Sequence, residues 1–189
     1  CSSALADDHV EKKNTVEVIG VTPVLGVGLP KEKIPYNVQS ATAEDLKSNT
    51  SLDITDFMNR NFGSLAINDA QNNPLQPDIQ YRGFSASPLL GLPQGLAVYQ
   101  NGVRVNEVFG DTINWDLLPE SSIANLNLVG GSNPVFGLNT LGGAISLETK
   151  NGFTHVGHNF EVYGGPVHDR FVLTAESGGN NGTFGYYGT

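Results

Sequence analysis

The sequence is poor in cysteine, in basic residues and in long apolar runs. Its one cysteine, Cys1, excludes an internal disulfide and a cysteine-based zinc site. Lys and Arg together number 10 against 19 Asp and Glu, which gives a formal net charge of −9. That balance argues against a nucleic-acid-binding protein, which needs a basic stripe. No apolar run reaches the length of a membrane-spanning helix.

The patterns of known catalytic and metal sites are also missing. The chain has 4 histidines, and His155 and His158, three apart on a strand, would face opposite ways. No nucleophile elbow, Walker loop or EF-hand spacing occurs. We therefore expect a protein that is not an enzyme, with no catalytic residues, no metal and no cofactor.

The N-terminus allows three interpretations. Ala4, Leu5 and Ala6 before Asp7 have the A-x-A form of a signal-peptidase site, so they could be the tail of a signal peptide. The same residues could be an ordinary small-residue terminus. A lipid-modified Cys1 is the third alternative.

What the chain does have is glycine, 23 residues in all, and the densest run is 129–150. An apolar strand with Leu126 and Leu128 leads into it. A glycine turn, Phe136-Gly137 and then Gly142-Gly143 follow, and the run ends in a strand that finishes at Thr149-Lys150. Glycines this dense mark tight turns or close backbone approaches.

Upstream of this run the pattern predicts short helices and strands. We expect a helical turn at 43–47 and a second helix to about Arg60, capped by Thr50 or Ser51. Residues 34–40, 64–68 and 124–129 are expected strands, and Pro119 opens a short helix to Ile123. Residues 78–84 alternate as one strand, with Ile79 and Tyr81 on the same face. In 96–106, Asn101-Gly102 between alternating strands predicts a type I′ hairpin.

The order of these segments resembles the plug domain of TonB-dependent outer-membrane receptors. Residues 78–84 (DIQYRGF) resemble the family's "I.IRGF", and 96–105 (LAVYQNGVRV) resemble "V.VYIDGVRV". The glycine-rich run resembles "RGP…YG…GG.I.I.TK". The resemblance covers about 16–150. It implies an α+β fold, with a small mixed β-sheet, short helices and long loops, lodged inside a barrel.

The resemblance also implies a function and a cellular place. Such receptors take up a scarce solute, for example a ferric siderophore, cobalamin or a glycan, with energy delivered through TonB. They lie in the outer membrane of Gram-negative bacteria, with the plug inside the barrel and the N-terminus in the periplasm. No nucleic-acid partner is expected.

The N-terminal segment 1–33 is expected to be flexible or extended, and part of it resembles the box that recruits TonB. Alternating β-branched residues suit strand addition to another protein's sheet. The alternative is that this stretch is the domain's own edge strand. The residues of the box are Val16, Glu17, Val18, Ile19, Gly20, Val21 and Thr22.

The family's solute meets the plug at the loops before "I.IRGF" and after "DGVRV", here 69–77 and 107–115. We expect amides, carboxylates and aromatic rings there to contact the solute, with packing in the core as the alternative for Trp115 and Phe109. In place of the family's basic residue before "GP" stand Val129 and Gly130, which leaves Arg82 for plug-to-barrel contact. The expected solute-binding residues are Asp69, Gln71, Asn72, Asn73, Phe109, Asp111, Asn114 and Trp115.

After Lys150 the character of the chain changes. Residues 156–163, 170–177 and 184–187 alternate apolar and polar side chains, as outer-membrane barrel strands do, and Gly178-Gly179-Asn180 are expected to form a turn. We therefore predict three parts: the segment 1–33, a plug at 34–150, and at 151–189 the first strands of a truncated β-barrel, so that the chain looks like a fragment. The alternative is a soluble secreted β-rich binding or adhesion domain whose own sheet these strands complete.

Overall fold

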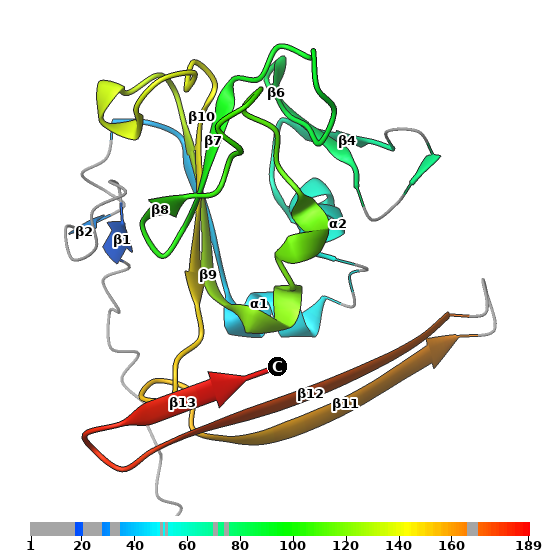
Figure 1. Ribbon diagram of the computed structural model, residues 1–189, viewed down its shortest axis with the longest axis vertical. Coiled ribbons are helices and arrows are strands. Elements are labelled where there is room, and N and C mark those ends of the chain that lie inside the picture. Colours follow the sequence, from blue (N-terminus) through cyan, green and yellow to red (C-terminus); the bar gives the residue numbers. More distant parts are fainter. Residues whose placement is uncertain are drawn as a thin grey trace, which may run out of the picture.

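The computed structural model describes residues 18–20, 28–30, 35–49, 51, 53–69, 72–73, 76–165 and 170–189. The fold is α+β, with a central mixed sheet that carries helices and a small sheet on one side and a separate sheet below them (Figure 1). The central sheet has 5 strands in the order β3-β9-β10-β7-β8. They are β3 (Val38–Thr42), β7 (Leu96–Gln100), β8 (Val103–Arg104), β9 (Ile123–Gly130) and β10 (Gly143–Thr149).

The central sheet buries both of its faces. β10 runs parallel to β7 and antiparallel to β9. Alternate side chains such as Leu128 and Ile145 enter the main core, while Tyr99 and Ala144 belong to a second cluster on the opposite face. Strands buried on both faces read as near-continuous apolar runs, which explains why 96–99 contains only Leu, Ala, Val and Tyr.

Two short helices follow β3 directly. Thr42 ends β3 and caps α1 (Ala43–Ser48) through a capping box with Asp45. The helix α2 (Ile54–Asn61) is capped by Asp53, whose carboxylate accepts from the backbone N–H groups of Thr55 and Asp56. The predicted caps Thr50 and Ser51 were wrong, because the aspartate can both bond these amides and face the positive end of the helix.

The small sheet consists of β4 (Leu65–Asn68), β5 (Asp78–Tyr81) and β6 (Phe84–Ala86) in antiparallel order. The prediction of one strand over 78–84 was wrong, since the chain reverses at Arg82 and Gly83. Both residues have positive φ, 51° and 86°, the conformation that closes a tight hairpin. Ile79 and Tyr81 are buried together, as the alternation predicted.

The main core lies between the central sheet, α2 and the small sheet. Ile54, Phe57 and Met58 form the buried face of α2. Burying each such side chain contributes roughly 1.5–3 kcal/mol, so this helix is held mainly by packing. The 3₁₀ turn Glu120–Ser122 follows Pro119 close to its predicted place and leads into β9.

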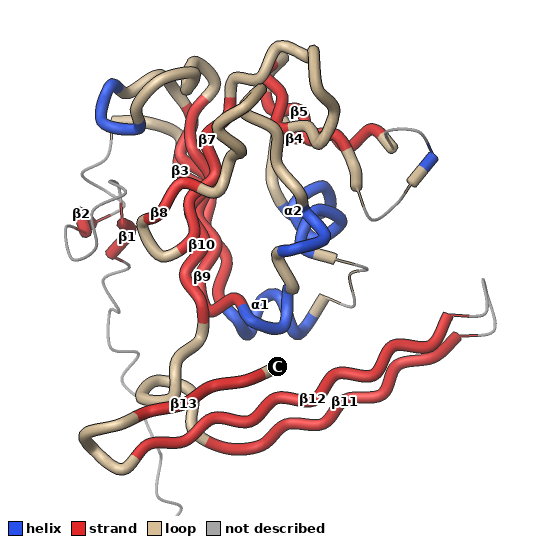
Figure 2. The backbone as a smooth tube through the Cα atoms, in the orientation of Figure 1, coloured by secondary structure: helices blue, strands red, loops and turns tan. Residues whose placement is uncertain are grey.

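The third sheet is an antiparallel meander of β11 (Gly157–Gly165), β12 (Arg170–Asn180) and β13 (Gly185–Gly188), which lies below the rest in Figure 2. The predicted turn at Gly178-Gly179-Asn180 was wrong, because these residues continue β12. A Cβ at Gly178 would collide with the carbonyl oxygen of His155, so a glycine there permits close packing of the preceding segment.

The remaining strands, β1 (Val18–Gly20) and β2 (Gly28–Pro30), pair antiparallel. No helix in the described ranges is both long and apolar enough to cross a membrane.

Candidate functional site

The β7–β8 hairpin carries the residues that organise the loops at one end of the molecule. Asn101 and Gly102 have φ of 50° and 81°, and Tyr99 pairs with Arg104, as a two-residue type I′ turn requires. β8 is only 2 residues long. Beyond it, Asn106 Oδ1 accepts from Val98 N at 2.7 Å and Asn106 Nδ2 donates to Leu96 O at 3.2 Å. Where β8 has ended, the Asn106 side chain thus forms hydrogen bonds with backbone groups of β7.

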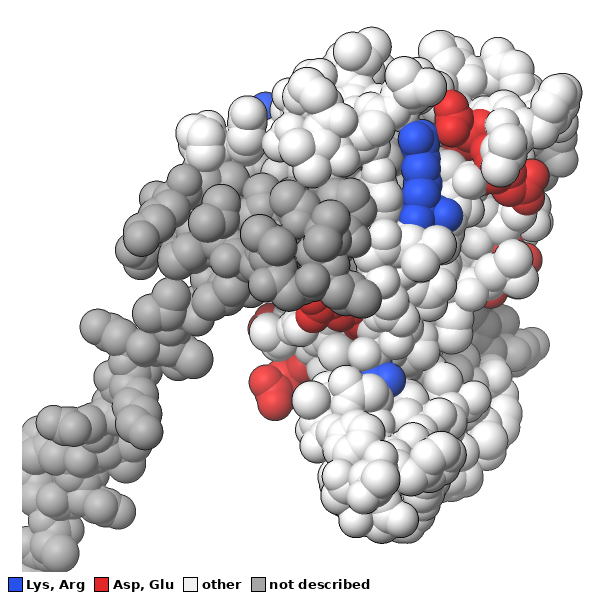
Figure 3. All heavy atoms as spheres, turned by 60° about the vertical axis from the view of Figure 1, so that its left-hand side comes forward, with Lys and Arg blue, Asp and Glu red and all other residues white. Residues whose placement is uncertain are grey.

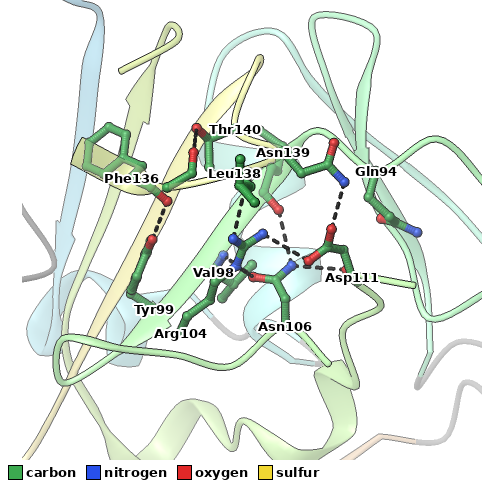
Figure 4. Close-up of polar contacts among 12 residues, drawn as sticks. Gln94, Val98, Tyr99, Arg104, Asn106, Asp111, Phe136, Leu138, Asn139 and Thr140 are labelled. Carbon is green, nitrogen blue, oxygen red and sulfur yellow. Dashed lines mark hydrogen bonds and ion pairs between the residues drawn. The ribbon is translucent and has the colours of Figure 1, made fainter. Parts of the chain in front are cut away.

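Arg104 joins two loops that are distant in sequence (Figure 4). Its Nη2 lies 3.1 Å from Asp111 Oδ1 and its Nη1 donates to Leu138 O at 2.8 Å. The second carboxylate oxygen of Asp111 accepts from Asn139 Nδ2 at 2.7 Å. Loop 107–112 and loop 131–142 are therefore tied together by one ion pair and two hydrogen bonds.

Loop 131–142 is also fixed from the sheet side. The Tyr99 hydroxyl donates to Phe136 O, at the end of the 3₁₀ turn Pro134–Phe136. Phe136 is buried, and Thr140 Oγ1 donates to Gly137 O at 3.0 Å. Burial raises the pKa of Tyr99 and outweighs the opposing charge of Arg104, so the hydroxyl keeps its proton and remains a donor.

The surface of these loops is inverted, with polar groups bonded to one another and apolar groups facing outward. Val108 is fully exposed, Phe109 is 81% exposed and Leu138 is 86% exposed. The loop 88–93 belongs to the same surface, because the side chain of Leu90 lies against Gly110. In the face that Figure 3 shows, the topmost side chains are uncharged, and basic and acidic side chains lie directly below them. Apolar side chains gathered in this way mark an interaction site.

The predicted solute-binding residues of loop 107–115 divide into three groups: bonded to other side chains, buried in the core, and exposed. Asp111 is bonded through both oxygens, and Asn114 Nδ2 donates to Glu107 Oε1 at 2.6 Å. Trp115 is buried, and its Nε1 donates to Ala86 O at 3.2 Å, so packing in the core is the alternative that holds for this residue. Phe109 faces solvent.

The structure describes only part of the loop 69–77. Figure 2 shows its described part beyond β4, on the right of the molecule, and loop 131–142 at the upper left. Asp69 is exposed and Asn72 adopts φ of 60°. Gln71 lies outside the described residues.

Arg82, predicted to contact a barrel, lies in the exposed β5–β6 turn, with its Cζ 5.2 Å from the ring centroid of Tyr81. Of the predicted TonB-binding stretch, Val18, Ile19 and Gly20 form β1. The rest of that stretch, Val16, Glu17, Val21 and Thr22, lies outside the described residues.

Sequence reasoning missed the junction between the central sheet and the third sheet. Lys150 Nζ lies 2.9 Å from Glu176 Oε2, and the two side chains are only 11% and 16% exposed. The Tyr187 hydroxyl donates to the same oxygen at 2.9 Å and lies 3.1 Å from Ser121 O. The sequence shows Lys150 at the end of a strand but not its pairing with Glu176, because the two residues are 26 positions apart.

The hydrogen bonds at this junction match the protonation states of Glu176 and Tyr187. Burial by itself raises the pKa of Glu176, but the hydrogen bonds from Lys150 and Tyr187 outweigh it and hold the pKa below its ordinary value. Burial and the neighbouring Glu176 raise the pKa of Tyr187. The carboxylate therefore stays ionised and the phenol stays a donor at neutral pH.

A second buried carboxyl lies nearby. Burial raises the pKa of Glu120 to about 7, with Asp53, Asp56 and Glu161 adding repulsion and the hydrogen bond from Ser51 opposing it. Ser51 Oγ lies 2.9 and 3.0 Å from the two oxygens of Glu120. Among the residues that the structure describes, no three His, Cys, Asp or Glu side chains gather as a metal site would need.

Comparison with protein families gives one match. Residues 30–144 match the family model described as TonB-dependent Receptor Plug Domain. No curated protein sequence matches the chain.

Solved structures share the fold at low sequence identity. FpvA of P. aeruginosa bound to heterologous pyoverdines has a TM-score of 0.62 and 15% identity, over 86% of this chain and 20% of that one. The ferric-catecholate import receptor Fiu of E. coli has a TM-score of 0.58 and 14% identity, over 82% and 20%. The Serratia marcescens hemophore receptor HasR, in complex with HasA and heme, has a TM-score of 0.55 and 14% identity, over 78% and 22%. The chain thus spans about a fifth of the length of each of these receptors.

Proposed function

Because the chain belongs to the TonB-dependent receptor plug domain family, we propose that it is the plug of an outer-membrane receptor for energy-coupled solute uptake. The solute is a scarce compound such as a ferric siderophore, cobalamin or a glycan. The similar structures include receptors named for ferripyoverdine, ferric catecholate and heme, which makes an iron compound the first solute to test. The family match, over more than half of the chain, carries this proposal.

The third sheet supports the proposal that 151–189 begins a barrel around the plug. On one face of β11 and β12, Phe160, Val162, Phe171 and Leu173 are exposed, and their register puts them side by side. Glu176 and Tyr187 occupy the opposite face and bond to Lys150 and Ser121. An apolar face toward lipid and a polar face toward the interior are what barrel strands require. The receptor is then an outer-membrane protein, with the N-terminal segment on the periplasmic side.

For solute contact we propose the exposed apolar side chains of the Arg104-linked loops, above all Phe109, Val108 and Leu138. A large ring can pack against an apolar or aromatic face of a solute, whereas the carboxylate of Asp111 already has partners. The loop 69–77, with Asp69, Gln71, Asn72 and Asn73, is the second proposed contact, and Arg82 stays the proposed contact to the barrel wall.

Coupling to TonB is assigned to residues 16–22. The extended backbone of Val18–Gly20 supports this, because a segment that already forms a strand can be added to the edge of a partner's sheet.

Uptake by cells that produce the whole receptor tests the function. The panel consists of ferric pyoverdine, a ferric catecholate, haem, cobalamin and a maltooligosaccharide, each radiolabelled. We expect the cells to accumulate one of these solutes. A protonophore should abolish this accumulation, and Phe109→Ala should reduce it. Accumulation that continues after the protonophore, or that occurs equally without the receptor, would refute energy-coupled uptake by this protein.

A further inference from the structure

Loop 107–112 depends on few interactions for its position. Glu107 N donates to Thr112 O at 2.8 Å and closes the loop. Inside it, Gly110 and Asp111 have φ of 85° and 53°, and the Asp111 conformation is one that a non-glycine residue rarely adopts. The exposed residues Val108 and Phe109 make no contribution to the core. The Asp111 carboxylate, held by Arg104 and Asn139, anchors the loop together with the Asn106 amide, which donates to Asp111 O, and the buried Thr112.

Arg104 is suited to hold both loops at once. Its Nε lies 3.3 Å from Asn106 Oδ1, its Nη1 donates to Leu138 O and its Nη2 pairs with Asp111. The three acceptors lie in different directions, which a planar guanidinium can satisfy and a single ammonium group cannot. Half-buried rather than enclosed, at 25% side-chain exposure, Arg104 is not needed to fill the core.

We propose that Arg104 is the positioning residue of the solute-binding surface, which fixes loop 107–112 against loop 131–142 so that Phe109 and Leu138 face the solute together. This inference rests on the proposed function for its biological meaning. Its structural content, that Arg104 ties both loops to β8 and reinforces the direct Asn139–Asp111 hydrogen bond between them, stands on the bonds alone. Asp111 is then a partner of Arg104 and not a solute contact.

Asn106 provides the contrast. It is buried, and its amide bonds to Val98, Leu96 and Asp111 through backbone groups. Replacing Asn106 leaves β7 with unsatisfied polar groups and lowers the stability of the whole domain. Replacing Arg104 removes the ion pair with Asp111 and the hydrogen bond to Leu138 O, which loosens the tie between the two loops and leaves the sheet bonded. The two variants should therefore differ in kind.

The direct test is a distance between the two loops. In this chain with Cys1→Ser, which removes its one cysteine, nitroxides are placed on Val108→Cys and Leu138→Cys, and the distance between them is measured by pulsed electron resonance. We expect one narrow distance distribution, which Arg104→Gln broadens strongly. Arg104→Lys should give an intermediate width, because it keeps a charge near Asp111 and loses the bond to Leu138 O.

Arg60→Gln is the matched control. Arg60 forms an ion pair with Asp56 at 2.8 Å on α2, remote in sequence from both loops, and its loss should leave the distance unchanged. Emission of the buried Trp115, the one tryptophan of this chain, reports whether the core stays folded. An unchanged distribution in Arg104→Gln, with normal Trp115 emission, would overturn the proposal. So would a broadening as large in Arg60→Gln.

Solute uptake separates this inference from the proposed function. With the radiolabelled panel, Arg104→Gln should raise the half-saturating concentration by about tenfold, the loss of one good contact, and leave the maximal rate unchanged. If the wild-type receptor takes up no member of the panel, the proposed function fails and the distance measurement still decides the role of Arg104. If uptake is normal and Arg104→Gln matches wild type in half-saturating concentration, the positioning role fails and the function stands.

Discussion

Glu120 is a half-buried carboxyl whose charge changes near neutral pH. Its pKa is raised to about 7 by burial and by the nearby carboxylates Asp53, Asp56 and Glu161. A carboxyl group whose folded pKa lies above its unfolded value of 4.5 stabilises the protein below 4.5. That contribution is lost as the pH rises through about 7, because the folded state then releases a proton that it held more tightly than the unfolded chain.

We therefore predict that the urea midpoint, followed by Trp115 emission, falls as the pH rises from about 4.5 to about 7 and levels off above that. Glu120→Gln keeps the hydrogen bond from Ser51 without a charge and should flatten this dependence. Glu44→Gln, in the exposed first turn of α1, is the control and should keep the wild-type profile. A Glu120→Gln profile as steep as wild type would show that the titrating group is another one.

Residue-scale sequence reasoning could not show partners that lie far apart along the chain. Amide and carboxylate side chains in loops were expected to face a solute, because burying them without partners costs free energy. Asp111 has such partners in Arg104 and in Asn139, the latter 28 residues away. The sequence could not show this pairing, since it depends on two loops meeting at one end of a sheet. Trp115 was left open between core and surface, and its bond to Ala86 O lies in the core.

At the scale of elements, local patterns were reliable and the role of glycine was not. The Asn101-Gly102 hairpin, α1 and the burial of Ile79 with Tyr81 follow from turn chemistry and alternation alone. A glycine pair reads as a turn from sequence, yet Gly178 and Gly179 lie within β12. Gly178 lets the segment with His155 pack closely, which depends on a contact more than 20 residues away, and Gly179 leaves room for the ring of Tyr186.

Substitution at Gly178 tests this reading of β12. Gly178→Ala places a Cβ against the carbonyl oxygen of His155, and the strain should lower stability by about 1–3 kcal/mol. Gly188→Ala, in β13, meets no atom within 4 Å and should be close to neutral. Scanning calorimetry of both variants makes the comparison. Equal midpoints for the two would mean that the segment does not pack on β12 in solution.

At the scale of the whole molecule, the junction at Lys150 joins the α+β part to the third sheet. Lys150 N donates to Ser122 O at 2.8 Å while its side chain bonds Glu176. One residue therefore contacts the 3₁₀ turn Glu120–Ser122 and β12 together. Removing one partner of a largely buried ion pair leaves a charge without compensation, which costs about 3 kcal/mol or more.

We predict that Lys150→Met speeds amide hydrogen exchange in both 120–123 and 150–156. The double variant Lys150→Met/Glu176→Leu should recover part of the protection, because it removes both charges. Arg60→Met breaks an exposed pair worth only about 0.3–0.5 kcal/mol and serves as the control. If amide hydrogen exchange in 150–156 stays at the wild-type rate in Lys150→Met, the junction is not held by this ion pair.

Coupling to TonB is the central claim, and calorimetric titration of this chain with the periplasmic domain of TonB tests it most directly. Strand addition requires backbone N–H donors in 16–22, and proline supplies none. We predict saturable binding by the wild-type chain, loss of binding in Val18→Pro, and wild-type affinity in Val10→Pro, which lies outside the proposed box. Absence of binding by the wild-type chain, or the same affinity in Val18→Pro, would contradict the assignment of this segment as the site where TonB engages the receptor.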